Sequence, residues 1–169
     1  MARVYVSVGS NIERERHVRS GLTALRECFG PLALSRIYES EAVGFSGDNF
    51  YNLVVGFDTQ QEVQAVAAGL RDIERAHSRD RNAPRFSSRS LDLDLLLYDD
   101  VVMEQAGIKL PREEITRYAF VLGPLAEIAG DMPHPLIGRG FADLWRDFDK
   151  RSQPMWPVEM ELGNCNRYA

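Results

Sequence analysis

Hydrophobic and polar positions change period along the chain in a way that predicts alternating strands and helices. Residues 3–8 alternate with β-branched and aromatic side chains, and turn and cap residues follow at 9–11. Apolar residues then recur at helical spacing as far as Gly30-Pro31, which ends the predicted helix. Residues 32–38 are predicted to form a second strand. The first part of the chain therefore predicts the order strand, helix, strand.

The middle of the chain continues this alternation. Residues 39–49 are rich in glycine and polar side chains and have no periodicity, which predicts a loop. The apolar, β-prone residues 50–57 predict a strand, and residues 61–77 place their apolar positions on one face of a helix. A polar stretch at 78–90 predicts an exposed loop, and residues 91–98 predict another strand.

The order strand, helix, strand, strand, helix, strand is that of an α+β fold, the ferredoxin-like βαββαβ sandwich. Residues 101–103 are expected to extend it with a hairpin, and residues 141–148 to add a late helix. We expect residues 1–150 to form a single domain, because 169 residues are enough for one hydrophobic core. Residues 151–169 show no clear pattern, and we expect a C-terminal tail there.

Two aspartates in the strand at 91–98 are the first candidates for chemistry. Residues two apart in a strand project from the same face, roughly 6.6 Å apart at about 3.3 Å per residue, so Asp92 and Asp94 point together. Leu91, Leu93 and Leu95 would face the core. Such a carboxylate pair can hold two hard cations and suits phosphoryl transfer. The same string also fits a half-solvated strand whose polar face is acidic.

An arginine-rich stretch just upstream favours the first of these alternatives. Guanidinium groups match phosphate oxygens bidentately, so arginines beside a metal-binding pair are complementary parts of an ATP site. Arg79, Arg81 and Arg89 are the best placed. Arg75 is interpreted as part of a solvated helix face, and a role for Arg71 stays open. Since the chain has no P-loop or protein-kinase motifs, any ATP chemistry uses another scaffold.

Composition and charge narrow the class of protein. The chain has 44% hydrophobic and 27% charged residues, as in an average folded domain. A formal net charge of -5 argues against a general nucleic-acid binder, which usually needs a surplus of lysine and arginine. No apolar run reaches membrane-spanning length, and residues 1–9 lack a signal-peptide pattern. We therefore expect neither nucleic-acid nor membrane partners. Because Cys28 and Cys165 have no metal-ligand spacing, we also expect a reduced, cytoplasmic setting.

Several short motifs, in order, resemble the 6-hydroxymethyl-7,8-dihydropterin pyrophosphokinase family. The resemblance covers roughly residues 3 to 150. The motifs that carry it are Val8-Gly9-Ser10-Asn11, Phe50-Tyr51-Asn52, Arg89-Ser90-Leu91-Asp92-Leu93-Asp94, Phe120-Val121-Leu122, Pro124-Leu125, Glu127-Ile128-Ala129 and His134-Pro135. The string around Asp92 and Asp94 is the most specific of them.

The resemblance implies an ATP-dependent enzyme that transfers the β,γ-diphosphate of ATP to the pterin hydroxyl and releases AMP, on the pathway of folate biosynthesis. Asp92 and Asp94 would bind two Mg²⁺ ions that bridge the phosphates. The family resemblance also implies nucleotide-binding residues: Arg79 and Arg81 closing over ATP, Arg89 beside the transferred group, Glu74 near the ribose or base, and Arg112 where a histidine that contacts ATP is frequent.

The resemblance implies a pterin site as well. Phe50 and Phe120 match aromatic residues that stack on the two faces of the ring. Asn52 and Ser40 match side chains that hydrogen-bond its polar edge, and the backbone near Val43 would complete that edge. Aromatic stacking with a few polar groups is what a flat, amide-like heterocycle requires.

The chain departs from the usual family pattern at several peripheral positions. Glu41 lies in the expected pterin loop, Glu113 follows Arg112, and Tyr118 stands where an arginine is common. Phe86-Ser87-Ser88 replaces a frequent Trp-Gly-Pro. Two alternatives therefore stay open beside the pyrophosphokinase: a divergent paralogue that binds nucleotide or pterin without turnover, and an enzyme that acts on a related pterin alcohol.

Overall fold

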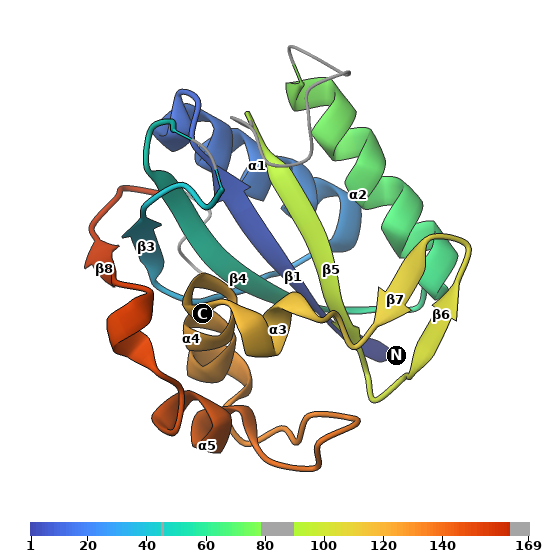
Figure 1. Cartoon of the computed structure of the whole chain (residues 1–169). Coiled ribbons are helices and arrows are strands. Elements are labelled where there is room, and N and C mark those ends of the chain that lie inside the picture. Colours follow the sequence, from blue (N-terminus) through green and yellow to red (C-terminus); the bar gives the residue numbers. More distant parts are fainter. Residues whose placement is uncertain (45, 79–89, 163–169) are drawn as a thin grey trace.

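An antiparallel sheet of six strands is the centre of the fold in the computed structural model, which describes residues 1–44, 46–78 and 90–162 (Figure 1). The strands of the described residues are β1 Ala2–Ser10, β2 Ala33–Leu34, β3 Ile37–Ser40, β4 Phe50–Thr59, β5 Asp92–Tyr98, β6 Met103–Gln105, β7 Ile108–Leu110 and β8 Met155–Val158. The helices are α1 Arg14–Phe29, α2 Val63–His77, α3 Glu114–Arg117, α4 Ala119–Ala129, α5 Phe141–Arg146 and the 3₁₀ turn η1 Lys150–Ser152.

The strand order confirms the predicted α+β architecture. Along the sheet the order is β5-β1-β4-β3-β8, with β2 also paired to β4. The first four strands of this path are those of the βαββαβ unit, and each pairs antiparallel with its neighbour. The predicted hairpin extension is the separate pair β6 and β7.

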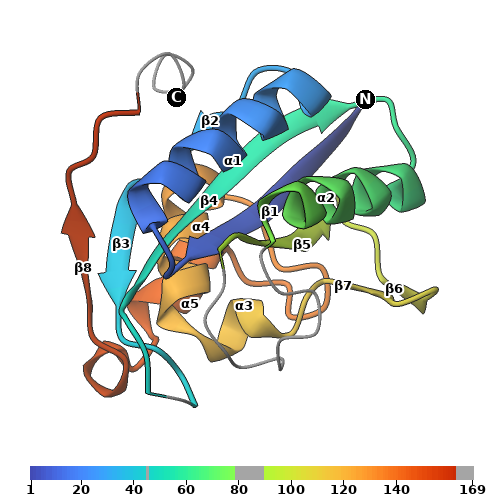
Figure 2. The same cartoon turned by 90° about the horizontal axis from the view of Figure 1, so that it is seen from above.

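Helices cover both faces of the sheet, so the fold has two cores (Figure 2). The first core lies under α1 and α2 and contains Val18, Leu22 and Leu70 with the inward side chains of β1 and β4. The second core lies under α4 and α5, where Leu122 and Phe141 are almost fully buried. The functional candidates of β5 lie at the edge of this second layer.

A β-bulge in β5 allows leucine side chains of this strand to pack in both cores. Its register against β1 skips one residue, because Leu95 is paired with Val6 and Leu97 with Tyr5, leaving Leu96 without a partner position. Up to Leu95 the leucines enter the first core, as predicted, whereas Leu96 and Leu97 both pack in the second. The bulge thus changes which side chains point to which face of the sheet, just after the aspartate pair.

Two segments before residue 150 differ from the predictions. Residues 32–38 form two short strands instead of one, because Ser35 interrupts them. The backbone N–H of Ser35 donates to the carbonyl of Val54 over 3.0 Å, and the backbone N–H of Val54 donates to Oγ of Ser35 over 2.9 Å. Helix α4 was not predicted at all. Phe120, which the family resemblance assigns to the pterin site, lies in the first turn of this helix.

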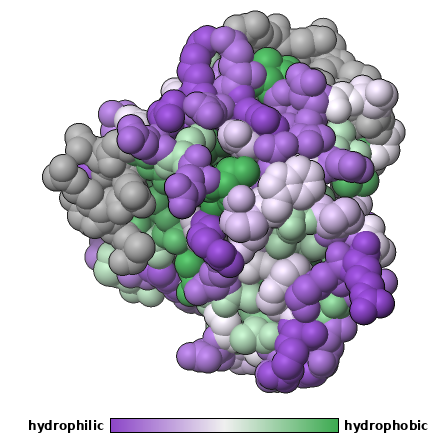
Figure 3. Space-filling view, turned by 90° about the vertical axis from the view of Figure 1, so that its left-hand side faces the viewer, coloured by the Kyte–Doolittle hydropathy of each residue, from purple (hydrophilic) through white to green (hydrophobic). Residues whose placement is uncertain are grey.

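The expectation of an irregular tail after residue 150 was wrong for its first part. Strand β8 pairs antiparallel with β3, with Tyr38 opposite Pro157 and Ser40 opposite Met155. Trp156 of this strand is 40% exposed. Hydrophilic and apolar residues are interspersed on the face of the molecule seen in Figure 3. Residues 153–158 are called the C-terminal brace below.

Gly21 marks the close approach of α1 to the start of β5. A Cβ at this position would lie 2.9 Å from both δ-carbons of Leu91, which is only 5% exposed. Overpacking a core costs about 1–3 kcal/mol, and the better helix propensity of alanine offsets about 1 kcal/mol. We expect Gly21→Ala to lower the free energy of unfolding by about 1 kcal/mol in urea denaturation. Thr23→Ala, on the exposed face of α1, is the control, and equal midpoints for the two variants would contradict the close approach.

Candidate active site

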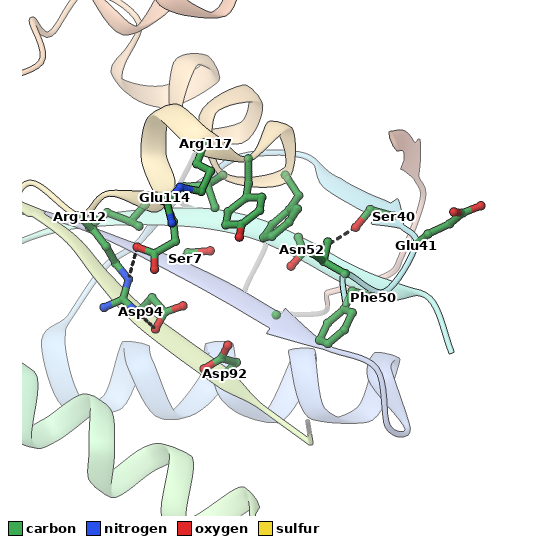
Figure 4. A pocket seen from close by; sticks show the side chains of 16 residues that line it. Ser7, Ser40, Glu41, Phe50, Asn52, Asp92, Asp94, Arg112, Glu114 and Arg117 are labelled. Atoms are coloured by element: carbon green, nitrogen blue, oxygen red, sulfur yellow. Dashed lines mark hydrogen bonds and ion pairs between the residues drawn. The ribbon is translucent and has the colours of Figure 1, made fainter. Parts of the chain in front are cut away.

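A pocket of about 240 Å³ lies between the ends of the central strands and the start of α4. Eight of the predicted site residues line it, together with residues that the sequence did not single out (Figure 4). The predicted ones are Ser40, Val43, Phe50, Asn52, Asp92, Asp94 and Phe120, joined by Arg112 from the predicted nucleotide set. We call this cavity the carboxylate pocket. Its residues come from β1, β3 and the loop that follows it, β4, β5 and the segment from Arg112 to Val121.

The carboxylate pair lies on one face of β5, as the alternation predicts. Asp92 is opposite Gly9 of β1, and Asp94 is opposite Ser7. Both aspartates are half-buried, and both contribute to the lining of the pocket. Because the opposing residues are small, space is left in front of the two carboxylates. A Cβ on Gly9 would lie 2.9 Å from Oδ1 of Asn52, so this glycine also makes room for the amide.

Arg112 lies between two acidic side chains of the pocket (Figure 4). Its Nη2 is 3.2 Å from Oδ1 of Asp94, and its Nε is 3.0 Å from Oε2 of Glu114. The backbone N–H of Arg112 donates to the carbonyl of Leu96, which fixes the residue against β5. The guanidinium therefore balances the charge of one member of the carboxylate pair.

The opposite wall of the pocket has aromatic and amide character. Nδ2 of Asn52 donates to Oγ of Ser40 over 3.0 Å, and both side chains are buried. The rings of Tyr118 and Phe120 stack with centroids 5.0 Å apart and an interplanar angle of 16°. Phe50 is half-buried at the start of β4. The ring of Phe50, the Tyr118–Phe120 pair and an ordered amide suit a flat heterocycle with a polar edge.

A hydrogen-bonded tyrosine holds α4 against β3 behind this wall. Tyr38 donates to Oε2 of Glu127 on α4 over 2.8 Å, and Arg36 donates to the Tyr38 oxygen over 2.8 Å. Burial, followed by the hydrogen bond to Glu127 and its charge, raises the pKa of Tyr38 to about 12. The phenol therefore keeps its proton at neutral pH and remains the donor in this contact.

A second hollow adjoins the carboxylate pocket between α2, β5 and the β6–β7 hairpin. Asp94 and Arg112 line both cavities, and Arg71 and Lys109 add positive charge to the second one. Glu74, predicted near the ATP ribose or base, lies in this hairpin hollow and not in the carboxylate pocket. Its carboxylate accepts the backbone N–H of Leu93 over 2.9 Å and so ties α2 to β5.

Other candidates fall in two groups. Arg79, Arg81 and Arg89 lie outside the described residues. The sequence did not single out Ser7, Glu114, Arg117 or Val121 as site residues, although all of them line the carboxylate pocket. Glu41 also lines the pocket rim, and its carboxylate points away from the Asn52 side (Figure 4).

Asp92 and Asp94 are the side chains that could hold a divalent cation. Carboxylate oxygens on one strand face are the hard donors that Mg²⁺ prefers, and Mg²⁺ usually takes one or two of them plus water and substrate phosphate. Among residues 1–44, 46–78 and 90–162 no group of three or more His, Cys, Asp or Glu is arranged for a metal ion. The two carboxylates therefore fit a cation that completes its shell with phosphate and water.

The described helices include none with the length and apolar character to cross a membrane.

Structural comparison supports the architecture. The chain superposes on a Plasmodium falciparum HPPK-DHPS wild type crystallised with pteroate, with a TM-score of 0.70 and 11% sequence identity, covering 89% of this chain and 45% of that one. At this identity the likeness concerns the fold, and the chain spans less than half the length of that protein.

Sequence comparison identifies the family. The chain is 30% identical over 138 residues to the 2-amino-4-hydroxy-6-hydroxymethyldihydropteridine pyrophosphokinase of Aquifex aeolicus, covering 80% of this chain and 86% of the relative. It is 33% identical over 137 residues to the protein of the same name from Pseudomonas aeruginosa, covering 79% and 84%. The model of the family described as 7,8-dihydro-6-hydroxymethylpterin-pyrophosphokinase matches residues 5–130. The resemblance drawn from the sequence motifs is thereby confirmed, and the chain belongs to the 7,8-dihydro-6-hydroxymethylpterin-pyrophosphokinase family.

Proposed function

We propose that this protein transfers diphosphate from ATP to the hydroxyl of 6-hydroxymethyl-7,8-dihydropterin and releases AMP, a step of folate biosynthesis. Membership of the pyrophosphokinase family supports this activity. The observation that carries the proposal for these residues is that one pocket joins the Asp92–Asp94 pair to a wall of aromatic and amide side chains. A phosphate chain and a flat heterocycle would then meet in a single cavity.

The aromatic side of the carboxylate pocket would bind the pterin. Phe50 and Phe120 would stack on its two faces, and the Asn52 amide with Ser40 would meet its polar edge, completed by backbone near Val43. The hydrogen bond between Asn52 and Ser40 fixes which way the amide faces, so the edge is ordered before the ligand arrives. The hydroxymethyl group of a ring held in this way would extend toward β5.

The acidic side of the pocket would bind the phosphates of ATP. Asp92 and Asp94 would hold two Mg²⁺ ions, which when bound neutralise phosphate charge and polarise the β-phosphorus. Arg112 would exchange its contact with Asp94 for phosphate oxygens. The hairpin hollow, which shares these two residues, would take the nucleoside end beside Glu74.

Transfer exchanges one phosphorus–oxygen bond for another. The pterin oxygen bonds to the β-phosphorus while the bond from that phosphorus to the oxygen bridging the α-phosphate breaks. The hydroxyl proton is released, and AMP leaves with the bridging oxygen. Negative charge grows on that oxygen, so nearby guanidinium groups stabilise the transition state. We assign this role to Arg89 and Arg112, with Arg79 and Arg81 closing over the nucleotide.

A coupled assay tests the proposal directly. Purified protein with ATP, Mg²⁺ and 6-hydroxymethyl-7,8-dihydropterin is expected to form AMP and pterin diphosphate in equal amounts. The same pterin with a methyl group in place of the hydroxymethyl group is the control, because it can fill the ring site but offers no nucleophile. AMP formation with the control would indicate plain ATP hydrolysis and overturn the assignment.

Two further outcomes would each replace the proposal with an alternative. Calorimetry that detects binding of an ATP analogue and of pterin, without any AMP release, would indicate a paralogue that has lost turnover. AMP release with a different pterin alcohol, and none with the hydroxymethyl compound, would identify a related substrate instead.

A further inference from the structure

The two walls of the pterin side come from distant parts of the chain. One wall is the end of β3 with the start of β4, where Ser40 and Asn52 lie. The other is the junction of α3 and α4, which carries Tyr118 and Phe120. The spacing of these walls decides whether a flat ring fits between them. The C-terminal brace contacts both walls, although it follows the region matched by the family model.

Gln153 of the brace contacts the helix junction through both ends of its side-chain amide. Its Oε1 accepts the backbone N–H of Ala119 over 2.9 Å, and its Nε2 donates to the backbone carbonyl of Arg117 over 2.9 Å. These two backbone groups flank Tyr118. A single side chain thus fixes the first amide of α4 and the last residue of α3 at the same time.

Helix α4 has no local substitute for this contact. Its N-cap residue is Tyr118, whose extended backbone ends α3, and no side-chain hydrogen bond caps the helix from that position. Ala119 is 1% exposed, so solvent cannot easily reach its N–H. A buried amide without a partner is destabilising, which makes the first turn of α4 dependent on Gln153. Phe120 lies in that turn.

The same segment pairs with the opposite wall two residues later. Met155 is opposite Ser40 in the register of β8 against β3. Met155 also approaches α4, since a Cβ on Gly123 would lie 2.5 Å from its Cε. The brace therefore runs from the aromatic wall to the amide wall over three residues. It thus links the two walls directly, in addition to the Tyr38–Glu127 hydrogen bond between β3 and α4.

We infer that Gln153 is a positioning residue for the pterin: it holds the start of α4 so that the Tyr118–Phe120 ring pair faces the Ser40–Asn52 edge. The inference rests on the proposed function, since it assigns the pterin to this pocket. Loss of the two hydrogen bonds leaves the first turn of α4 in the binding geometry for only part of the time, and the apparent dissociation constant rises in inverse proportion to that fraction.

Binding measurements on the full-length enzyme test this role. With a non-hydrolysable ATP analogue and Mg²⁺ present, Gln153→Ala is expected to weaken pterin binding about tenfold in calorimetry, while affinity for the analogue changes less than twofold. The Ala119 amide is expected to exchange its hydrogen faster in the same variant. Ser152→Ala is the matched control, because Ser152 Oγ donates only to the Asp149 carbonyl within the neighbouring turn.

Gln153→Glu keeps the test decisive if the alanine variant folds poorly. A carboxylate still accepts the Ala119 N–H at a helix N-terminus, but it cannot donate to Arg117, so pterin binding should weaken by an intermediate factor. Equal loss of pterin and nucleotide affinity in both variants would indicate a purely structural role and overturn the inference, as would unchanged pterin affinity. Absence of pterin binding in the wild-type protein would instead refute the proposed function itself.

Discussion

Asp92→Asn and Asp94→Asn are each expected to reduce AMP formation by at least about a hundredfold while leaving the fold intact, because loss of one preorganised electrostatic contact typically has this effect. Asparagine has nearly the shape of aspartate but cannot neutralise a cation. Both positions are half-buried on one strand face, so neither change leaves a cavity in the core. Turnover, Mg²⁺-dependent nucleotide binding and the melting temperature would be measured together.

The two variants also separate metal binding from release of Arg112. Asp94 is an ion-pair partner of Arg112, and a nucleotide site organised by that arginine alone would be sensitive to Asp94→Asn far more than to Asp92→Asn. The paired-carboxylate proposal expects comparable losses in both. Asp100→Asn, at an exposed position after β5, is the charge-matched control. Wild-type turnover in either site variant would refute the metal role.

Phe120→Ala is expected to weaken pterin binding by about 1–3 kcal/mol, or roughly 5- to 150-fold, the usual worth of stacking an aromatic side chain on a heterocyclic base. Removal of the ring also leaves Tyr118 without its stacking partner, so both parts of the aromatic wall are affected. Affinity for an ATP analogue should change less than twofold. Titration of pterin against intrinsic fluorescence, and of nucleotide by calorimetry, would measure the two constants.

Phe148→Ala provides the control for the loss of a ring. Phe148 stacks on Trp145 and packs against the second core, away from the residues that line the pocket. Its removal is expected to lower the melting temperature without a selective effect on pterin. Equal losses of pterin and nucleotide affinity in Phe120→Ala would remove this residue from the pterin site.

The strand order could be predicted from the sequence because those elements have clear periods. Residues of β5 alternate as far as Leu95, so the pattern predicted both the core leucines of this part and the common face of Asp92 and Asp94. Helix α4 has no such signal: residues Val121 to Leu125 are all buried, which removes the polar face, and Pro124 lies within the run. Strand β8 was missed because it is short, contains Pro157 and depends on β3, more than a hundred residues earlier.

The residues of the candidate site also divide into those that a local sequence pattern predicts and those that it does not. Asp92 and Asp94 are neighbours on one strand, so their proximity follows from local geometry. Family motifs supplied the residues proposed for the pterin, and these line the same pocket. Glu114 belongs to the pocket only because the segment after β7 passes over the sheet, which no local pattern reveals. Gln153 is harder still to foresee, since its partner Ala119 lies 34 residues away in the sequence.

The outer side of β8 limits how this protein can associate with itself. Among the described strands β8 forms one edge of the sheet, β5 forms the other, and β8 is only four residues long. Pro157 near its end has no N–H to offer an approaching backbone, and short edge strands with proline are poor templates for edge-to-edge pairing. A segment that contacts both walls of the carboxylate pocket thus also discourages growth of the sheet into intermolecular aggregates at this edge.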